Sequence, residues 1–233
     1  MASSLTVRQL TAPSDAEHQH MITLLEETFA HDTAMRCISG SSKDNRRAWC
    51  KVLIDKTLRE GQLWAAGHNG RIDALAFWFG PGVESAIVES NEYAAMLSQD
   101  MRDWINLHVG RILSVVLIPA DILCQYRPQY HELYRSAYAA GSRVRVQAWH
   151  LKLLAVRQSR QRQGLGSALV AVITEKADRD NLAMTTDTTS SNALYFLQRF
   201  GFRYIGVKNF VMQQYGFPMW CMIRETPTSS GYY

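Results

Sequence analysis

Residues 150–177 read HLKLLAVRQSRQRQGLGSALVAVITEKA: an apolar run, a basic turn with two glycines and an amphipathic stretch. The apolar run at 151–156 predicts a largely buried strand. Apolar side chains then recur at helical spacing, at Leu165, Leu169, Val172 and Ile173. Between the two elements, Gly164 and Gly166 leave room for a ligand against the main chain, and the first N–H groups of a helix have no partner within it. This turn therefore predicts a phosphate-binding site.

The residues of the turn exclude two common nucleotide-binding loops. Residues 161–166, QRQGLG, lack the Gly-Lys-Ser/Thr ending of a nucleoside-triphosphate loop. They also lack the third glycine of a dinucleotide fingerprint and the acidic residue that follows its second strand. A different phosphate-bearing ligand is expected.

A second block, residues 182–202, reads LAMTTDTTSSNALYFLQRFGF and predicts a short strand, a polar turn and a helix. One face of this helix is apolar, at Ala193, Phe196, Leu197 and Phe200. Gly201 stands where a left-handed residue is expected to end the helix, and Phe202 opens another strand. The two blocks together predict a strand–turn–helix–strand–helix unit.

This unit resembles the GNAT superfamily of acetyl-CoA-dependent N-acetyltransferases. The motif Gln161-x-x-Gly164-x-Gly166 is similar to the pyrophosphate loop of the family, and the second block resembles its strand and helix ending in Leu/Phe-Gly-Phe. Further stretches are similar in order to puromycin N-acetyltransferase-like members, namely residues 28–32, 63–66, 149–151, 187–189 and 220–222. The resemblance implies an α/β GNAT fold, a mixed central sheet with helices on both faces and a helical insertion between the third and fourth strands.

The resemblance also implies acetyl-CoA as the acyl donor, with the pantetheine arm on the strand and the pyrophosphate in the turn. The implied cofactor-binding residues are Leu154, Ala155, Val156, Gln161, Arg162, Gln163, Gly164, Leu165, Gly166, Ser167, Ser190 and Asn192. Backbone N–H groups at 154–156 could polarise the thioester carbonyl, provided that this strand diverges from its neighbour.

One position departs from the family. Many members carry a tyrosine four residues before the glycine of the Gly-Phe pair, where it can protonate the leaving thiolate, but this position is Leu197. Tyr195 is two residues earlier and points about 200° away around a helix. Position 190, an asparagine in many members, is Ser190, with Asn192 close by.

Asp187, His150 and Tyr195 are the candidate catalytic residues. Asp187 follows a strand and matches an acidic residue of the puromycin-acetylating enzymes, although a role in capping the turn at 188–191 is an equal alternative. His150 has a suitable intrinsic pKa for a base but is also explained as a core residue. Glu26 and Glu27 could reach the acceptor from the first helix, although exposed surface is the simpler interpretation.

The remaining sequence predicts one domain over residues 1–233, with a helical insertion at 80–144 and a flexible tail at 226–233. Ser14 and Glu17 form a capping-box pattern before a first helix, and a second helix is expected over 42–60. Strands are expected at 5–10, 62–67, 71–79, 202–212 and 217–225, with Asn69-Gly70 as a hairpin turn. The insertion predicts helices near 91–109 and 119–139, whose aromatic residues form a core layer, a lid over the acceptor, or both.

Composition limits the partners. An apolar content of 47% with 20% charged residues matches one soluble globular domain. The net charge of +4 is concentrated around the turn, at Arg157, Arg160, Arg162 and Arg179, which favours an anionic cofactor over nucleic acid. Four scattered cysteines favour free thiols and no metal site. The absence of a signal-peptide core and of an apolar run of about 18 residues predicts a cytoplasmic protein without membrane contact.

The sequence thus predicts an enzyme that acetylates a small-molecule amine. Two alternatives remain open: acetylation of a protein N-terminus or lysine, and a non-catalytic acyl-CoA-binding pseudoenzyme, for which Leu197 is the reason. The oligomeric state is not predicted.

Overall fold

A single mixed sheet organises the chain in the computed structural model, which describes residues 4–39, 43–85, 120–212 and 215–226. The strands are β1 (Leu5–Leu10), β2 (Gln62–His68), β3 (Ala74–Phe79), β4 (Trp149–Val156), β5 (Met184–Thr188), β6 (Arg203–Met212) and β7 (Tyr215–Arg224). The helices are α1 (Asp15–Thr28), α2 (Thr33–Ile38), α3 (Lys43–Glu60), α6 (Ala120–Ala137), α7 (Val144–Gln147), α8 (Leu165–Arg179) and α9 (Ser191–Gln198). Short 3₁₀ turns lie at Gly141–Arg143 and Gln158–Arg160.

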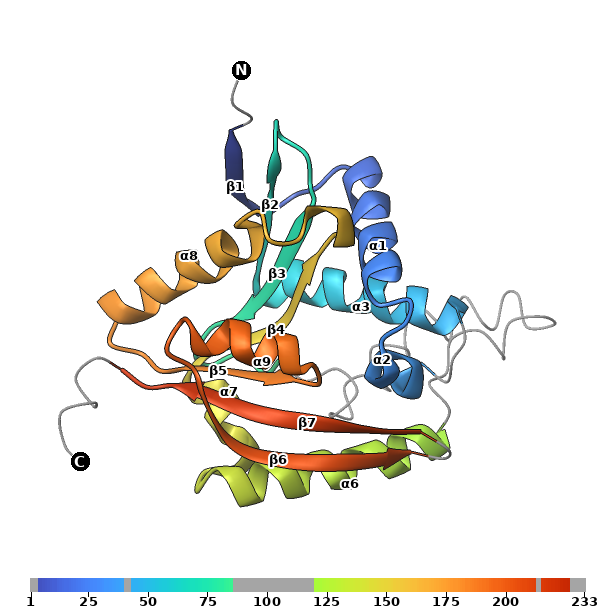
Figure 1. Cartoon of the computed structure of the whole chain (residues 1–233), viewed down its shortest axis with the longest axis vertical. Coiled ribbons are helices and arrows are strands. Elements are labelled where there is room, and N and C mark those ends of the chain that lie inside the picture. The colour runs from blue at the N-terminus through green and yellow to red at the C-terminus, as the bar shows by residue number, and fades with distance from the viewer. Residues whose placement is uncertain (1–3, 40–42, 86–119, 213–214, 227–233) are drawn as a thin grey trace.

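The seven strands follow the order β1-β2-β3-β4-β5-β7-β6. Only β4 and β5 are parallel neighbours, and every other pair is antiparallel (Figure 1). Alternate residues of β3 enter two different cores because side chains alternate across a sheet. Leu75 and Phe77 pack with α1, α2, α3 and α6, whereas Ala76 and Trp78 pack with α8 and α9. The expected mixed sheet with helices on both faces is therefore confirmed.

Local signals in the N-terminal half predicted the start of α1 and the turn between β2 and β3, but not the short helix α2. Ser14 accepts the N–H of Glu17 at 3.3 Å while the Glu17 carboxylate accepts the N–H of Ser14 at 2.9 Å, a complete capping box. Asn69 and Gly70 have φ of 55° and 77°, as the hairpin turn requires. The strand expected over 71–79 begins only at Ala74, and residues 71–73 between the turn and the strand have no regular structure.

The described part of the predicted insertion is α6, the 3₁₀ turn at Gly141–Arg143 and α7, between β3 and β4 in the chain. The helix expected near 91–109 lies outside the described residues, as does most of the tail expected at 226–233. Figure 1 shows α6 running along β6, and the two elements are in contact. Three of its tyrosines are buried in the core, namely Tyr126, Tyr130 and Tyr134, as is Tyr138 directly after it. This helix is therefore a core layer.

Other sequence expectations concern the membrane and the cysteines. Among the described residues no helix is both long and apolar enough to cross a bilayer. Cys37, Cys50 and Cys221 are free and buried thiols.

Candidate functional site

The parallel strands β4 and β5 diverge in the middle of the sheet. Their pairing runs from Trp149 opposite Met184 to Leu151 opposite Thr186. β4 continues to Val156 with β3 as its partner, and a bulge against β3 adds an extra residue at Lys152. The divergence that the sequence interpretation required is thus present, since the second half of β4 has a side that β5 does not cover.

The hydrogen-bond ladder between β3 and β4 determines which backbone groups of β4 face the gap that opens where β4 and β5 diverge. The N–H of Arg157 donates to the carbonyl of Asp73 at 2.9 Å. Because successive residues of an antiparallel ladder point their backbone groups alternately toward and away from the partner, Val156 and Leu154 direct theirs away from β3. In agreement, the Gln161 side-chain amide donates to the Val156 carbonyl at 3.3 Å.

The turn after β4 ends in an uncapped helix N-terminus. Arg162 and Gly164 both have positive φ, 59° and 84°. Gly164 precedes the first helical residue, and no side chain caps α8. The Ala168 N–H makes the first helical bond, to the Gly164 carbonyl at 2.9 Å, so the N–H groups of residues 165–167 have no partner within the helix. Uncapped N–H groups at the positive end of a helix dipole suit an anion.

Gly166 brings this helix against the strand. A Cβ atom at Gly166 would lie 3.5 Å from Val156 Cγ2, 3.7 Å from Leu154 Cδ2 and 3.5 Å from Phe196 Cζ of α9. These are ordinary van der Waals contacts. The predicted strand, turn and second helix therefore meet at one point.

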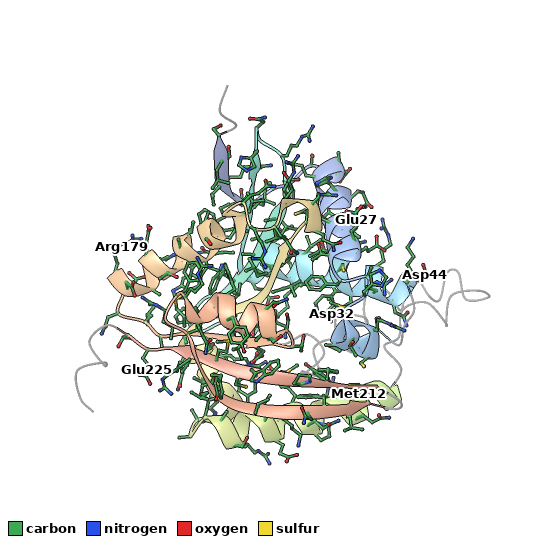
Figure 2. The ribbon with its side chains drawn as sticks, viewed as in Figure 1. Glu27, Asp32, Asp44, Arg179, Met212 and Glu225 are labelled. Atoms are coloured by element: carbon green, nitrogen blue, oxygen red, sulfur yellow. The ribbon has the colours of Figure 1, made fainter. Side chains whose placement is uncertain are left out.

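Two of the four arginines expected to surround the phosphate-binding turn, Arg157 and Arg179, have other partners or lie elsewhere. Arg157 pairs with Glu27 at 2.6 Å and lies 3.6 Å from Asp73, so it ties the turn to α1 and to the end of β3. Figure 2 shows Arg179 at the opposite end of α8, which corrects its assignment to the turn: a helix of 15 residues separates the two points by about 20 Å. Arg160 and Arg162 remain at the turn.

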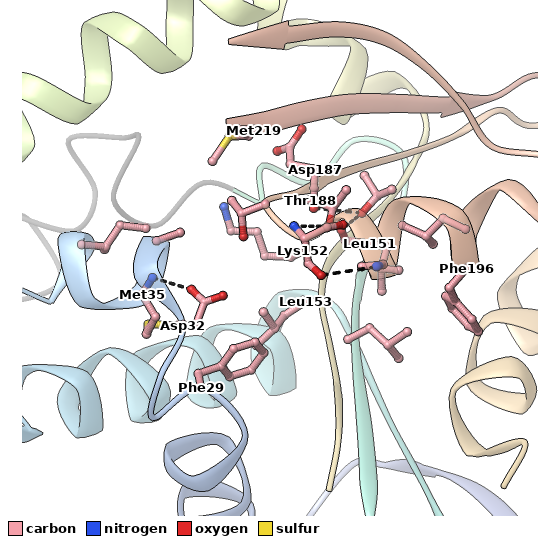
Figure 3. Close-up of a pocket in the computed structure, with 18 of the residues that line it drawn as sticks. Phe29, Asp32, Met35, Leu151, Lys152, Leu153, Asp187, Thr188, Phe196 and Met219 are labelled. Carbon is pink, nitrogen blue, oxygen red and sulfur yellow. Dashed lines mark hydrogen bonds between the residues drawn. The ribbon is translucent and has the colours of Figure 1, made fainter. Parts of the chain in front are cut away.

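A cavity of about 210 Å³ opens where β4 and β5 diverge (Figure 3). The sheet, α9 and the turn between them line it with Leu151, Lys152, Leu153, Leu154, Thr186, Asp187, Thr188, Thr189, Ser190, Ala193, Phe196, Leu197 and Met219. The helices α1, α2, α3 and α6 and their ends line it mainly with apolar residues, namely Phe29, Asp32, Ala34, Met35, Ile38, Trp49 and Tyr126. A single cavity thus joins the uncovered side of β4 to an apolar space that carries carboxylates.

Asp187 lines this cavity from β5. Its two carboxylate oxygens accept hydrogen bonds from the hydroxyls of Tyr130 and Tyr134, each at 2.6 Å. The alternative role in capping the following turn belongs to other side chains. Thr188 Oγ1 accepts the Ser190 N–H at 3.2 Å, and Ser190 Oγ accepts the Ala193 N–H at 3.4 Å as the N-cap of α9.

Asp32 is a second acidic residue of the cavity and was not recognised as a site residue from the sequence. It is the N-cap of α2, where Oδ1 accepts the Met35 N–H at 2.7 Å. Figure 3 shows Asp32 and Asp187 approaching the cavity from different elements. An N-cap pattern could have located this helix start, but only the tertiary structure brings Asp32 into the same cavity as Asp187.

His150 and Tyr195 are not among the described residues that line the cavity. His150 is fully buried, with Nδ1 3.0 Å from Thr185 Oγ1 and with no hydrogen-bond partner for Nε2 among the described residues. Burial, and then the charges of Arg145 and Lys152, hold the pKa of His150 well below its usual value. The Tyr195 side chain is 66% exposed on α9.

The other candidate positions separate in the same way. Leu197 lines the cavity, whereas Asn192 is exposed. The Ala155 side chain is buried in the core that the sheet forms with α1, α2, α3 and α6. Glu26 and Glu27 pair with Arg47 and Arg157. Within the described residues, no group of three or more His, Cys, Asp or Glu side chains could hold a metal ion.

Comparison with known proteins agrees with this geometry. Residues 130–222 match the family model described as an acetyltransferase (GNAT) domain, which begins inside the segment expected as an insertion. No curated protein sequence matches the chain significantly.

Solved structures are similar over almost the whole chain. A polyamine N-acetyltransferase from Drosophila melanogaster that forms N-acetylagmatine is 16% identical, covering 94% of this chain and 99% of its own, with a TM-score of 0.60. An arylalkylamine N-acetyltransferase from Aedes aegypti is 16% identical, with 95% and 98% covered and a TM-score of 0.54. A Corynebacterium glutamicum protein described as histone acetyltransferase HPA2 and related acetyltransferase is 20% identical, with 96% and 97% covered and a TM-score of 0.57. The chain therefore has the fold of the GNAT N-acetyltransferases and carries the sequence pattern of their acetyltransferase domain over residues 130–222.

Proposed function

We propose that this protein is an enzyme that transfers an acetyl group from acetyl-CoA to the amine of a small molecule. The observation that carries the proposal is the single cavity that joins the uncovered backbone of β4 to an apolar space with two carboxylates. Similar structures include enzymes for polyamine and arylalkylamine acceptors, which supports an amine acceptor.

The turn and the diverging strand fit the donor. When bound, acetyl-CoA supplies the acetyl group as a thioester. The uncapped N-terminus of α8 suits its pyrophosphate, with Gln161, Arg162, Gln163, Gly164 and residues 165–167 around it. The backbone groups of Leu154 and Val156 face the gap, where they can bond the pantetheine arm and polarise the thioester carbonyl. Ser190, at the N-terminus of α9, lies on the cavity wall, and Asn192 is two residues further on.

The acceptor end suits a cation with an apolar body. Asp187 and Asp32 supply negative charge, and Phe29, Trp49 and Met219 supply apolar surface. An alkylamine is mostly protonated at neutral pH, so a carboxylate at the reacting nitrogen attracts it. The nitrogen must lose one proton to the carboxylate or to solvent before it attacks, and a negative charge beside it then stabilises the positive charge that develops on the neutral amine during attack. Asp187 is our first candidate for this place. His150 and Tyr195 remain weaker proposals because both lie off the cavity.

The leaving thiolate does not require the tyrosine that many family members carry. A thiolate is a tolerable leaving group, and general acid assistance changes a rate by about 10²–10⁴-fold rather than deciding whether transfer occurs. Leu197 therefore argues for a slower enzyme more than for a pseudoenzyme.

Three finer assignments remain proposals. The resemblance to puromycin N-acetyltransferase-like members rests on the order of short stretches in the sequence. The cytoplasmic location is supported by the buried free thiols, which suit a reducing compartment. Acetylation of a protein N-terminus or lysine is the alternative activity, because one similar structure is described as related to histone acetyltransferases.

One experiment decides among these functions. The protein is incubated with acetyl-CoA and one acceptor at a time, and the release of free CoA is measured. The acceptors are spermidine, agmatine, phenylethylamine, a peptide with a free N-terminus and a lysine-containing peptide. Turnover with a small amine supports the proposal, and turnover with the peptides alone supports the alternative activity. Binding of acetyl-CoA in calorimetry without turnover of any acceptor favours the pseudoenzyme.

A further inference from the structure

Two of four regularly spaced tyrosines, three on α6 and one directly after it, form hydrogen bonds to Asp187. Tyr126, Tyr130, Tyr134 and Tyr138 follow one another at intervals of four residues, with adjacent ring centroids 5.6, 4.8 and 5.4 Å apart. The hydroxyl of Tyr130 lies 2.6 Å from Asp187 Oδ2, and that of Tyr134 lies 2.6 Å from Oδ1. The hydroxyl of Tyr138 instead donates to the Met222 carbonyl at 3.1 Å.

The direction of the Tyr130 hydrogen bond follows from its other partner. Arg145, which is 2% exposed, donates from Nη1 to the Tyr130 oxygen at 2.9 Å. A guanidinium cannot accept a hydrogen bond, so the single proton of Tyr130 points to Asp187. The Arg145 guanidinium also lies 5.1 Å from the ring centroids of both Tyr130 and Tyr134, which fixes the two rings beside each other.

The other groups around Asp187 remain neutral. Burial, and then the charge of Asp187, raise the pKa of the Tyr134 hydroxyl well above its usual value, so it stays a donor. The same two causes, in the same order, raise the pKa of the Cys221 thiol on β7 and that of Tyr138. Asp187 is therefore the acidic group of this cluster. The Arg145 guanidinium bonds to Tyr130, which bonds to Asp187, and Lys152 lines the same cavity.

We propose that Tyr130 and Tyr134 are positioning residues that hold Asp187 as a fixed anion at the cavity wall, and that this anion binds the acceptor in its protonated ammonium form. The inference rests on the proposed function and narrows its substrate class to strongly basic alkylamines. Each carboxylate oxygen has a second lone pair besides the one that a tyrosine uses, and Asp187 lines the cavity, so the ammonium can donate to an oxygen that cannot rotate away.

The test compares Tyr130→Phe and Tyr134→Phe with Tyr138→Phe. All three remove one buried hydroxyl from the same row of tyrosines, but the Tyr138 hydroxyl bonds to the Met222 carbonyl and not to Asp187. With the active acceptor from spermidine, agmatine and phenylethylamine, the first two variants should raise the acceptor KM about tenfold, since each loses a hydrogen bond to a charged group. Acetyl-CoA affinity should stay unchanged, and Tyr138→Phe should keep the natural KM. Unfolding midpoints are measured for all three.

A double-mutant cycle separates positioning from a general structural effect. In an Asp187→Asn background, Tyr130→Phe and Tyr134→Phe should have no further effect on the acceptor KM, because they act through the carboxylate. Equal KM values for all three tyrosine variants, or full additivity with Asp187→Asn, would overturn the inference.

A measurement on the natural protein does not depend on any variant folding. If the ammonium form binds, the KM for total amine should stay nearly constant between about pH 6 and 8, where an alkylamine of pKa about 10 is almost wholly protonated. If the neutral amine binds, the KM should fall about tenfold per pH unit, which would overturn the inference while the proposed function stands. No turnover with any amine would instead overturn the proposed function, and the inference with it.

Discussion

Gly166 at the start of α8 lies against Val156 of β4: a Cβ atom added to Gly166 would be 3.5 Å from the Val156 methyl carbon Cγ2. This distance is ordinary packing, and the backbone of Gly166 is helical. The protein alone therefore has room for an alanine there, and a glycine is needed only if something else approaches the same backbone.

Gly166→Ala should accordingly separate folding from donor binding. The free energy of unfolding should be unchanged or higher by up to about 1 kcal/mol, because alanine is the better helix former. The affinity for acetyl-CoA should fall, because the added methyl group stands where the pantetheine arm or pyrophosphate approaches. Calorimetry and urea unfolding measure the two quantities. Unchanged affinity in a stable variant would remove the donor site from this turn. Gly164→Val is a poorer test, since φ of 84° there strains any branched residue.

Arg162→Ala and Arg160→Ala should weaken CoA binding by about 1–3 kcal/mol if these side chains contact phosphate. Titration with CoA and with dephospho-CoA locates the contact: a loss confined to CoA indicates the 3′-phosphate, and an equal loss indicates the pyrophosphate. Arg157→Ala is the control, because its partners are Glu27 and Asp73 and its effect should appear in stability. If neither ligand is affected by the first two variants, these arginines only face solvent.

Asp32→Asn should raise the KM for a cationic acceptor several-fold without unfolding α2. Asparagine is as good an N-cap as aspartate, so the bond to the Met35 N–H is retained while the charge is lost. Asp32→Ala, which loses both, should in addition cost about 1 kcal/mol of stability. Steady-state kinetics and thermal unfolding of the pair distinguish charge from capping, and an unaltered KM in Asp32→Asn would leave Asp32 with a structural role alone.

Leu197→Tyr should raise the turnover number, because Leu197 lines the cavity and a hydroxyl there could protonate the leaving thiolate. General acid assistance sets an upper limit of about 10²–10⁴-fold. Leu197→Phe is the matched control, since it adds the ring without the hydroxyl. Tyr195→Phe should change nothing, as this side chain is 66% exposed. Equal rates for the tyrosine and phenylalanine variants would show that position 197 does not reach the sulfur.

His150 should make stability depend on pH. Burial holds its pKa well below the unfolded value of 6.5, so the folded state keeps the ring neutral and the unfolded state binds the proton more readily. The stabilisation is complete above pH 6.5 and should be lost as pH falls below it, by at most about 1.4 kcal/mol per pH unit. Urea unfolding of the natural protein and of His150→Gln between about pH 5 and 7.5 isolates this histidine from the others, and parallel pH profiles would contradict the assignment.

The sequence by itself determined the features that depend on neighbours in the chain. The capping box of Ser14 and Glu17, the left-handed Asn69-Gly70 turn and the glycine turn before α8 were all predictable, because each is a contact or a backbone conformation within a few residues. The periodicity of the two signature blocks likewise predicted the strands and helices to which we assign the proposed donor site.

Only the tertiary structure decided what meets across the chain. Tyr130 and Tyr134 reach Asp187 over 57 and 53 residues, and no local pattern records that α6 lies under β7 and β6 with these hydroxyls beside β5. Asp32 has the sequence signature of a helix cap, and its place on the cavity wall depends on how α2 packs. The basic residues near the turn looked alike in the sequence, but Arg157 is held by ion pairs and Arg179 stands a whole helix away. Charge and hydrogen-bonding capacity belong to single residues, whereas their partners are set by the packing of distant elements.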